Sequence, residues 1–117
     1  MATAAVTTEI LQSGEAILYT WTLTQANTVG EAITAHEYGD RTVQMTGTFG
    51  TGTFTMEGAN VGTYTTLTDP QGNGISKTAA AIEQVLEVPR LTRPNSSGST
   101  GAESVVVTLF CRRTIRR

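Results

Sequence analysis

The side chains that could do chemistry are few and scattered. The chain has a single histidine, His36, with Glu37 beside it in a stretch that indicates a weak strand over residues 31–38. Neighbouring residues on a strand point to opposite faces, so these two cannot act as a pair. With one histidine there is no H-x-H or H-E-x-x-H spacing for a metal. We therefore expect His36 to be an ordinary surface residue, and we expect no metal and no other cofactor.

The only cysteine offers little more. Cys111 excludes an internal disulfide and a multi-cysteine metal site. It falls in an alternating apolar stretch, where a lone cysteine is typically a small buried hydrophobe. No G-x-S-x-G motif and no nucleophile–histidine–acid order accompany it.

The carboxylates and the glycine-rich stretch also lack a catalytic arrangement. Asp40 and Asp69 both lie in turn sequences, and Asp69 before Pro70 is typical of a turn initiator. The glutamates are dispersed, so a glycosidase-like pair would need folding to bring two of them together. Residues 47–52 (GTFGTG) are followed by no helix and no Lys-Ser/Thr, which excludes a phosphate cradle. These absences predict a protein that is not an enzyme.

The charge divides along the chain. Up to Glu87 nine acids stand against Arg41 and Lys77, a balance of −7; from Val88 onward six arginines stand against Glu103, a balance of +5, and the sum is the net −2. An acidic body with a basic end favours docking on copies of the same chain or on an acidic partner, although the basic end could also serve only solubility. The candidate interface residues are Arg90, Arg93, Arg112, Arg113, Arg116 and Arg117.

Two classes of partner are not expected. The net charge is negative and no aromatic residues alternate with the arginines, which is unlike a nucleic-acid interface. No apolar run approaches the ~18 residues that span a bilayer. The N-terminal MATAAVTTE lacks the basic and apolar regions of a signal peptide. We therefore expect no membrane contact, and synthesis in a cytoplasm without export.

The hydrophobic pattern of the chain has a period of two, which indicates strands. Thr is the commonest residue and Gly occurs 12 times among 117 residues, a composition typical of short strands and tight turns. Two alternating apolar stripes are clearest: Ile17, Tyr19, Trp21 and Leu23, and Val105, Val107, Leu109 and Cys111. We predict that both face the core. The alternative for Tyr19 and Trp21 is an exposed aromatic platform that stacks on sugars.

The whole pattern predicts an all-β protein, a small β-sandwich or jelly roll of about seven or eight short antiparallel strands. We expect a hairpin over Arg41–Gly58 with its turn at Gly50–Gly52, and at most one helical turn, within Ser76–Leu86. Residues 1–14 form an N-terminal arm or edge strand, 15–113 the sandwich domain, and 114–117 a basic C-terminal tail.

The stretches VQMTGTFGTGTFTMEGANVGTYTTLTDPQGNGI, AAIEQVLEVPRLTRP and GTGAESVVVTLFCRR resemble small virion proteins of tailed phages. The likeness is greatest to head decoration, or cementing, proteins of short-tailed phages. Their pattern is V-x-V-x-G-T-F-G, a G-(S/A)-N-x-G loop, L-T-D-P-x-G, I-E-x-V-L-E-x-P-R and V-T-L-x-x-R-R. The match covers about Arg41 to Arg113; the N-terminal part does not follow it.

The resemblance implies a homo-oligomer, a dimer or trimer, that clamps adjacent major capsid proteins on the outer surface of the head. The expected location is the virion, after synthesis in the bacterial cytoplasm. The alternative is a tail- or fibre-associated β module that binds a carbohydrate or a receptor.

Overall fold

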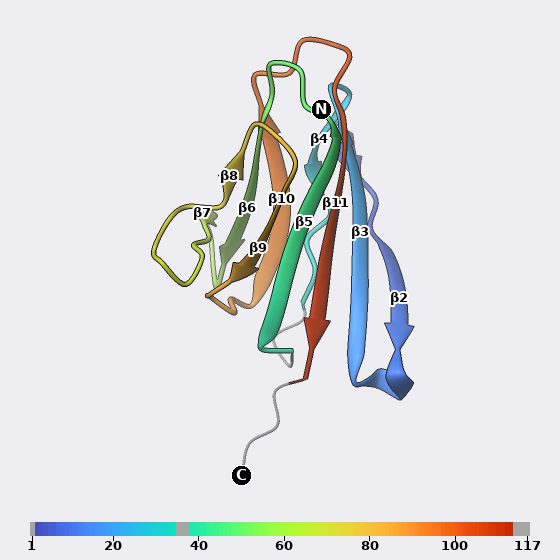
Figure 1. Ribbon diagram of the computed structural model, residues 1–117, viewed down its shortest axis with the longest axis vertical. Coiled ribbons are helices and arrows are strands. Elements are labelled where there is room, and N and C mark those ends of the chain that lie inside the picture. The colour runs from blue at the N-terminus through green and yellow to red at the C-terminus, as the bar shows by residue number, and fades with distance from the viewer. Residues whose placement is uncertain (1, 35–37, 114–117) are drawn as a thin grey trace.

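The protein is a sandwich of two β-sheets, which confirms the predicted fold class. The computed structural model describes residues 2–34 and 38–113 (Figure 1). Sheet A has the strand order β1 (Ala2–Ala4), β4 (Asn27–Gly30), β10 (Leu91–Ser97), β6 (Thr53–Ala59) and β7 (Thr65–Thr66), and β8 (Ser76–Lys77) also pairs with β6. Sheet B has the order β2 (Thr7–Leu11), β3 (Ala16–Thr24), β11 (Ser104–Arg112), β5 (Asp40–Thr48) and β9 (Ala81–Val85).

The strands are more numerous than expected. The described residues form eleven strands, not seven or eight, because several of them are only two to five residues long. Their pairing is antiparallel with one exception, since β1 runs parallel to β4. Short strands at sheet edges carry too little alternation to be recognised from a sequence pattern.

The core is built from the two stripes that alternation predicted. The inward side chains are the odd-numbered ones: Trp21 and Leu23 of β3, and Val105, Val107, Leu109 and Cys111 of β11. All of them are almost completely buried. The Trp21 indole Nε1 donates a hydrogen bond of 2.9 Å to the carbonyl oxygen of Glu31. Trp21 is therefore a core residue whose polar atom is satisfied.

The predicted hairpin over Arg41–Gly58 is wrong, although both of its strands exist. β5 belongs to sheet B and β6 to sheet A, so the connection crosses between the sheets instead of reversing within one. Phe49 turns inward at this crossing and meets the Phe54 ring edge-on at a centroid distance of 5.3 Å. The Gly52 amide donates to the Phe49 carbonyl and closes the turn.

The stretch Ser76–Leu86, for which at most one helical turn was predicted, contains no helical turn. This stretch contains β8 and β9, and the single helical element of the described residues is a short 3-10 turn, Gln12–Gly14. The small residues of Thr78–Ala80 lie at the crossing from β8 in sheet A to β9 in sheet B. No helix of the described segments is long and apolar enough to cross a membrane.

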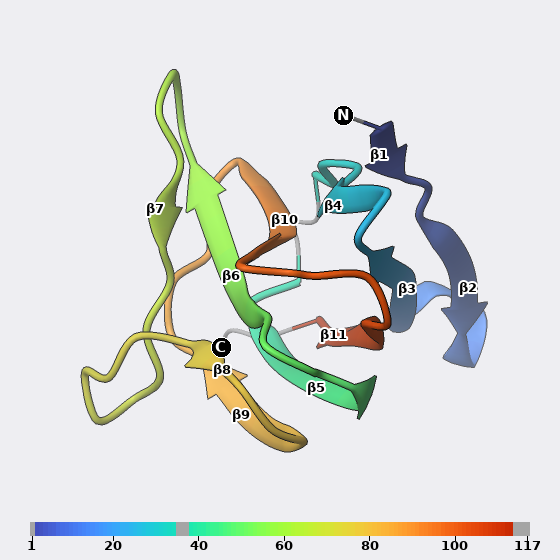
Figure 2. The same cartoon turned by 90° about the horizontal axis from the view of Figure 1, so that it is seen from above.

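The first strands join the two sheets at one side of the sandwich. β1 pairs with β4 in sheet A, and β2 pairs with β3 in sheet B. Figure 2 shows them at the side opposite β8 and β9. Between them the Val6 amide donates to the Glu31 carboxylate at 3.0 Å. The first described residues are thus part of the sheets, and the tail at 114–117 lies outside the described residues.

Candidate functional surfaces

The candidate interface arginines that the structure describes are spread over both sheets. Arg93 lies on the outer face of sheet A, where its Nε is 2.7 Å from a carboxylate oxygen of Glu57, its cross-strand neighbour. The guanidinium carbon of Arg93 sits 3.7 Å from the centroid of the Tyr64 ring. A cation held between a carboxylate and an aromatic face is well fixed, so Arg93 has a structural role on this sheet.

Arg112 and Arg113 lie at the end of β11 in sheet B. Arg112 forms an exposed ion pair of 3.0 Å with Asp40, and Arg113 stacks over the Tyr38 ring at 4.9 Å. Just before β10, the Nε of Arg90 donates to the carbonyl oxygen of Asn60. The role of these residues in an interface stays a prediction.

The division of charge along the sequence does not carry over into space. Arg116 and Arg117 lie outside the described residues. Among the rest, the basic half supplies partners to the acidic half, as Glu57 and Asp40 show, and Lys77 pairs with Glu83 at 2.8 Å. Two ion pairs thus join the acidic and the basic part of the sequence, and the role of the basic end stays a prediction.

Glu103 is the most heavily hydrogen-bonded carboxylate. It is buried, and it accepts from the amides of Thr51, Thr100 and Gly101 at 2.8–3.1 Å and from the hydroxyls of the two threonines. These donors come from the β5–β6 crossing and from the loop before β11. Glu103 therefore joins two loops, and its hydrogen bonds with their amides lower its pKa from 4.5 to about 2.

The low pKa of Glu103 predicts an acid-sensitive link between these loops. Because the folded-state pKa lies below the ordinary 4.5, the ionised carboxylate stabilises the fold above that value, and the stabilisation is lost as the pH falls toward about 2. Glu103→Gln should therefore lower stability at neutral pH, and the difference from wild type should vanish near pH 2. Urea unfolding at a series of pH values measures this.

The control for that series is Glu9→Gln, which makes the same change in net charge on the exposed strand β2. A gap between wild type and Glu103→Gln that stays constant from neutral pH to pH 2 would contradict the role of the ionised carboxylate.

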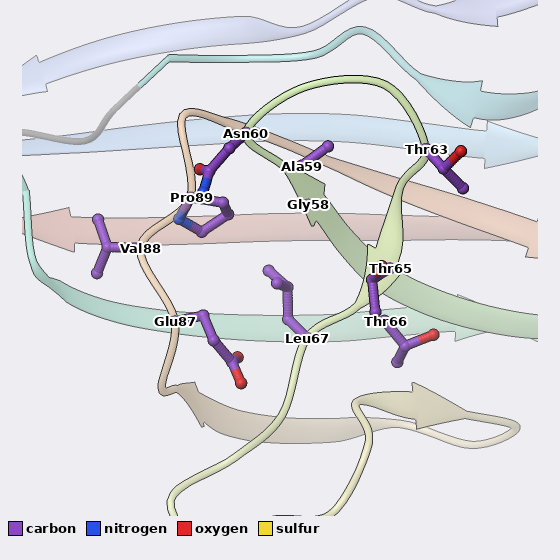
Figure 3. Close-up of a pocket in the computed structure, with 10 residues that line it drawn as sticks. All are labelled: Gly58, Ala59, Asn60, Thr63, Thr65, Thr66, Leu67, Glu87, Val88 and Pro89. Atoms are coloured by element: carbon purple, nitrogen blue, oxygen red, sulfur yellow. The ribbon is translucent and has the colours of Figure 1, made fainter.

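A groove of about 510 Å³ opens beside the end of β6 (Figure 3). Its walls come from the β6–β7 loop, from β7 and from residues 87–89. Gly58 permits this arrangement, because a Cβ there would lie 2.4 Å from Cγ of Pro89. Hydrogen bonds of Arg90 to Asn60 hold the loop against the same segment. The groove is thus a fixed feature of the fold.

Glu87 is the only ionisable residue among those that line the groove. Its carboxylate accepts from both the amide and the hydroxyl of Thr68. Partial burial acts to raise the pKa of Glu87, but the hydrogen bonds from Thr68 outweigh it and the pKa is lowered. A carboxylate with a lowered pKa is ionised at neutral pH, so Glu87 is not placed there to donate a proton as a general acid.

Two other residues that could take part in chemistry, Cys111 and Arg41, are buried in the core. Burial raises the pKa of the Cys111 thiol to about 11, which makes it unreactive. Arg41, whose burial sequence analysis did not anticipate, donates from Nε to the Tyr38 carbonyl and from Nη1 to the Thr92 hydroxyl of sheet A. Arg41 lies opposite Cys111 on β11. Its alternation with Val43 and Met45 was the one sequence signal of its burial.

No set of three metal-ligating side chains occurs within residues 2–34 and 38–113. His36 and Glu37 lie outside the described residues. Comparison of the chain with protein-family models, with curated proteins and with solved structures finds no match. The resemblance to phage decoration proteins therefore rests on the motifs alone.

Proposed function

We propose that the protein is a phage capsid decoration protein, which binds the outer surface of the major capsid protein shell and stabilises the head. It acts by binding and not by catalysis, on a virion assembled in the bacterial cytoplasm. Its partners are the major capsid protein and copies of itself.

One structural observation supports this proposal most. Nearly every carboxylate that could do chemistry is used to fix a loop or a strand, as Glu103, Glu87 and Glu57 are. Asp69 likewise accepts from the amides of Gln71 and Asn73 and forms the predicted turn. The surface that such a chain presents to other molecules is rigid and unreactive. When many copies bind one shell, weak individual contacts give strong overall binding. The motifs of residues 41–113 supply the reason to choose a capsid.

The decisive experiment mixes the purified protein with expanded capsids that lack it. Bound protein should appear on the capsids at regular sites, and the capsids should resist heat or chelator better. Absence of binding together with unchanged resistance would refute the proposal.

Neutralising the basic end of β11 should reduce capsid occupancy more than it affects folding. In Arg112→Gln/Arg113→Gln the losses include an exposed ion pair, a stacking contact and a long hydrogen bond from Arg113 to the Tyr38 hydroxyl, which together contribute about 1–2 kcal/mol to stability. Occupancy on capsids and urea unfolding are measured in parallel. Asp40→Asn is the matched control, since it breaks the same ion pair and keeps both arginines. Equal occupancy of the double variant and wild type would exclude a role for these arginines.

The alternative function is a tail or fibre module that binds carbohydrates. The observation that suggested it, an exposed aromatic platform, does not hold. Tyr19 and Trp21 are buried in the core and stack on each other at 6.3 Å between centroids, so they offer no platform for a sugar ring. A glycan array combined with Trp21 fluorescence tests what is left of this alternative.

A further inference from the structure

The outer edge of β9 is an unprotected sheet edge. β9 is the last strand of sheet B, and within the described residues it pairs only with β5. Sheet edges are usually blunted by charged side chains, above all lysine, by a proline or by a bulge. β9, AIEQV, has no lysine and no proline, and its register with β5 is continuous from Ala81 to Val85. Its one charged residue, Glu83, is paired with Lys77.

The direction of its main-chain groups follows from one hydrogen bond. The Leu86 amide donates to the Thr68 carbonyl and so does not point toward β5. Successive residues of an antiparallel strand direct their N–H and C=O groups to alternate sides. Ile82 and Gln84 therefore direct theirs to the free edge, as Leu86 does.

Two exposed apolar side chains lie on either side of Gln84 along this edge. Ile82 is 62% exposed, and Leu86, which continues the same alternation, is 54% exposed. The only charged side chain of the strand, Glu83, is already paired with Lys77 at 2.8 Å. The edge thus presents a neutral stripe with two pairs of unused main-chain groups.

We propose that two copies of this chain pair through β9, antiparallel about a two-fold axis at Glu83. In this register Ile82 of one copy faces Gln84 of the other, and all four free main-chain groups of each copy form hydrogen bonds. Centring the axis on Gln84 would instead bring Ile82 opposite Leu86, whose amide is occupied. The two Ile82 side chains then lie diagonally across the axis, within reach of each other.

Charge complementarity favours a second copy over another strand. Two Glu83 carboxylates directly opposite each other would repel. Here each brings its own Lys77, so the four charges near the axis sum to zero. An acidic or a basic peptide would leave this group unbalanced. The opposite edge of sheet B is less suited, because exposed β2 carries Glu9 in the middle of the strand.

Isologous pairing of this kind closes on itself, so it gives a dimer and no fibre. The inference deepens the proposed function, since it names the self-contact by which a decoration protein would form its unit. It is nevertheless measured on purified protein without capsids. A failure of capsid binding leaves the dimer intact, and a failure to dimerise leaves the capsid assay open.

The test is light scattering behind size-exclusion chromatography over a concentration series, together with amide hydrogen exchange. Wild type should be a dimer with protected Ile82 and Gln84 amides. Ile82→Lys should be a monomer with an unchanged circular dichroism spectrum. Ile10→Lys, at the exposed edge strand β2, is the matched control and should stay dimeric. A wild-type monomer or trimer, or a dimer that Ile82→Lys leaves intact, would overturn the proposal.

Two further variants separate pairing from folding. Gln84→Pro removes an amide that points away from β5, so it should abolish the dimer and keep the monomer folded. Lys77→Ala leaves two opposed carboxylates and should weaken association by up to about fivefold. Adding Glu83→Gln to Lys77→Ala should restore it. Association that Gln84→Pro does not change, or that the added Glu83→Gln does not restore, would contradict the register.

Discussion

Gly47→Ala is expected to lower the free energy of unfolding by about 3 kcal/mol or more, a large share of the 5–15 kcal/mol typical of a domain. Gly47 lies on β5 at φ +130°, a conformation that L side chains rarely adopt. A Cβ there would stand 2.2 Å from the carbonyl oxygen of Ser104 on β11. That contact is with main chain, so no side-chain rotation can relieve it.

The measurement is urea unfolding followed by circular dichroism. Thr46→Ala is the matched control, because Thr46 is the exposed neighbour on the same strand and its replacement should cost about 0.5 kcal/mol or less. If Gly47→Ala were as stable as this control, the close approach of β5 and β11 at Ser104 would be wrong.

Trp21→Ala should destabilise the protein by about 3–5 kcal/mol. The substitution leaves a cavity in the centre of the sandwich, since Trp21 is fully buried. It also removes the Nε1 donor to the carbonyl of Glu31, whose segment leads from β4 to the bridge of Ile33 with Thr92 of β10. Both effects act in the same direction.

Because Trp21 is the only tryptophan, unfolding of this variant is followed by far-ultraviolet circular dichroism. Thr22→Ala, exposed on the same strand, controls for the change of strand propensity. A loss for Trp21→Ala as small as that for Thr22→Ala would indicate an exposed ring and would reopen the carbohydrate alternative.

The long central strands could be predicted from the sequence because alternation is a local signal. Ile17 to Leu23 and Val105 to Cys111 alternate over a full strand with one face apolar, and both faces were assigned correctly. The turn at Asp69 was also predictable, since Asp-Pro and Gly-Asn-Gly have a local mechanism.

Sheet assignment could not be predicted, because pairing is not local. Residues 41–58 contain two strands around a glycine-rich turn, and this pattern is the same for a hairpin and for a crossing between sheets. What decides the outcome is the inward turn of Phe49 and the anchoring of Thr51 by Glu103, 52 residues away. Likewise, no local signal marks Glu103 as a buried acceptor, and the alternation that places Arg41 inward does not show that it links the two sheets.

The place of β11 in sheet B has a consequence for the timing of folding. This last strand lies in the middle of the sheet, between β3 and β5, so Val105 pairs with Leu23 on one side and with Gly47 on the other. Sheet B is completed only when β11, far along the chain from β3, has taken its place between β3 and β5. Folding is therefore governed by contacts of long sequence separation, a topology for which millisecond-to-second rates are typical. Until β11 joins the sheet, the edges of β3 and β5 that pair with it are open, and chaperones that bind exposed strands would act on these edges.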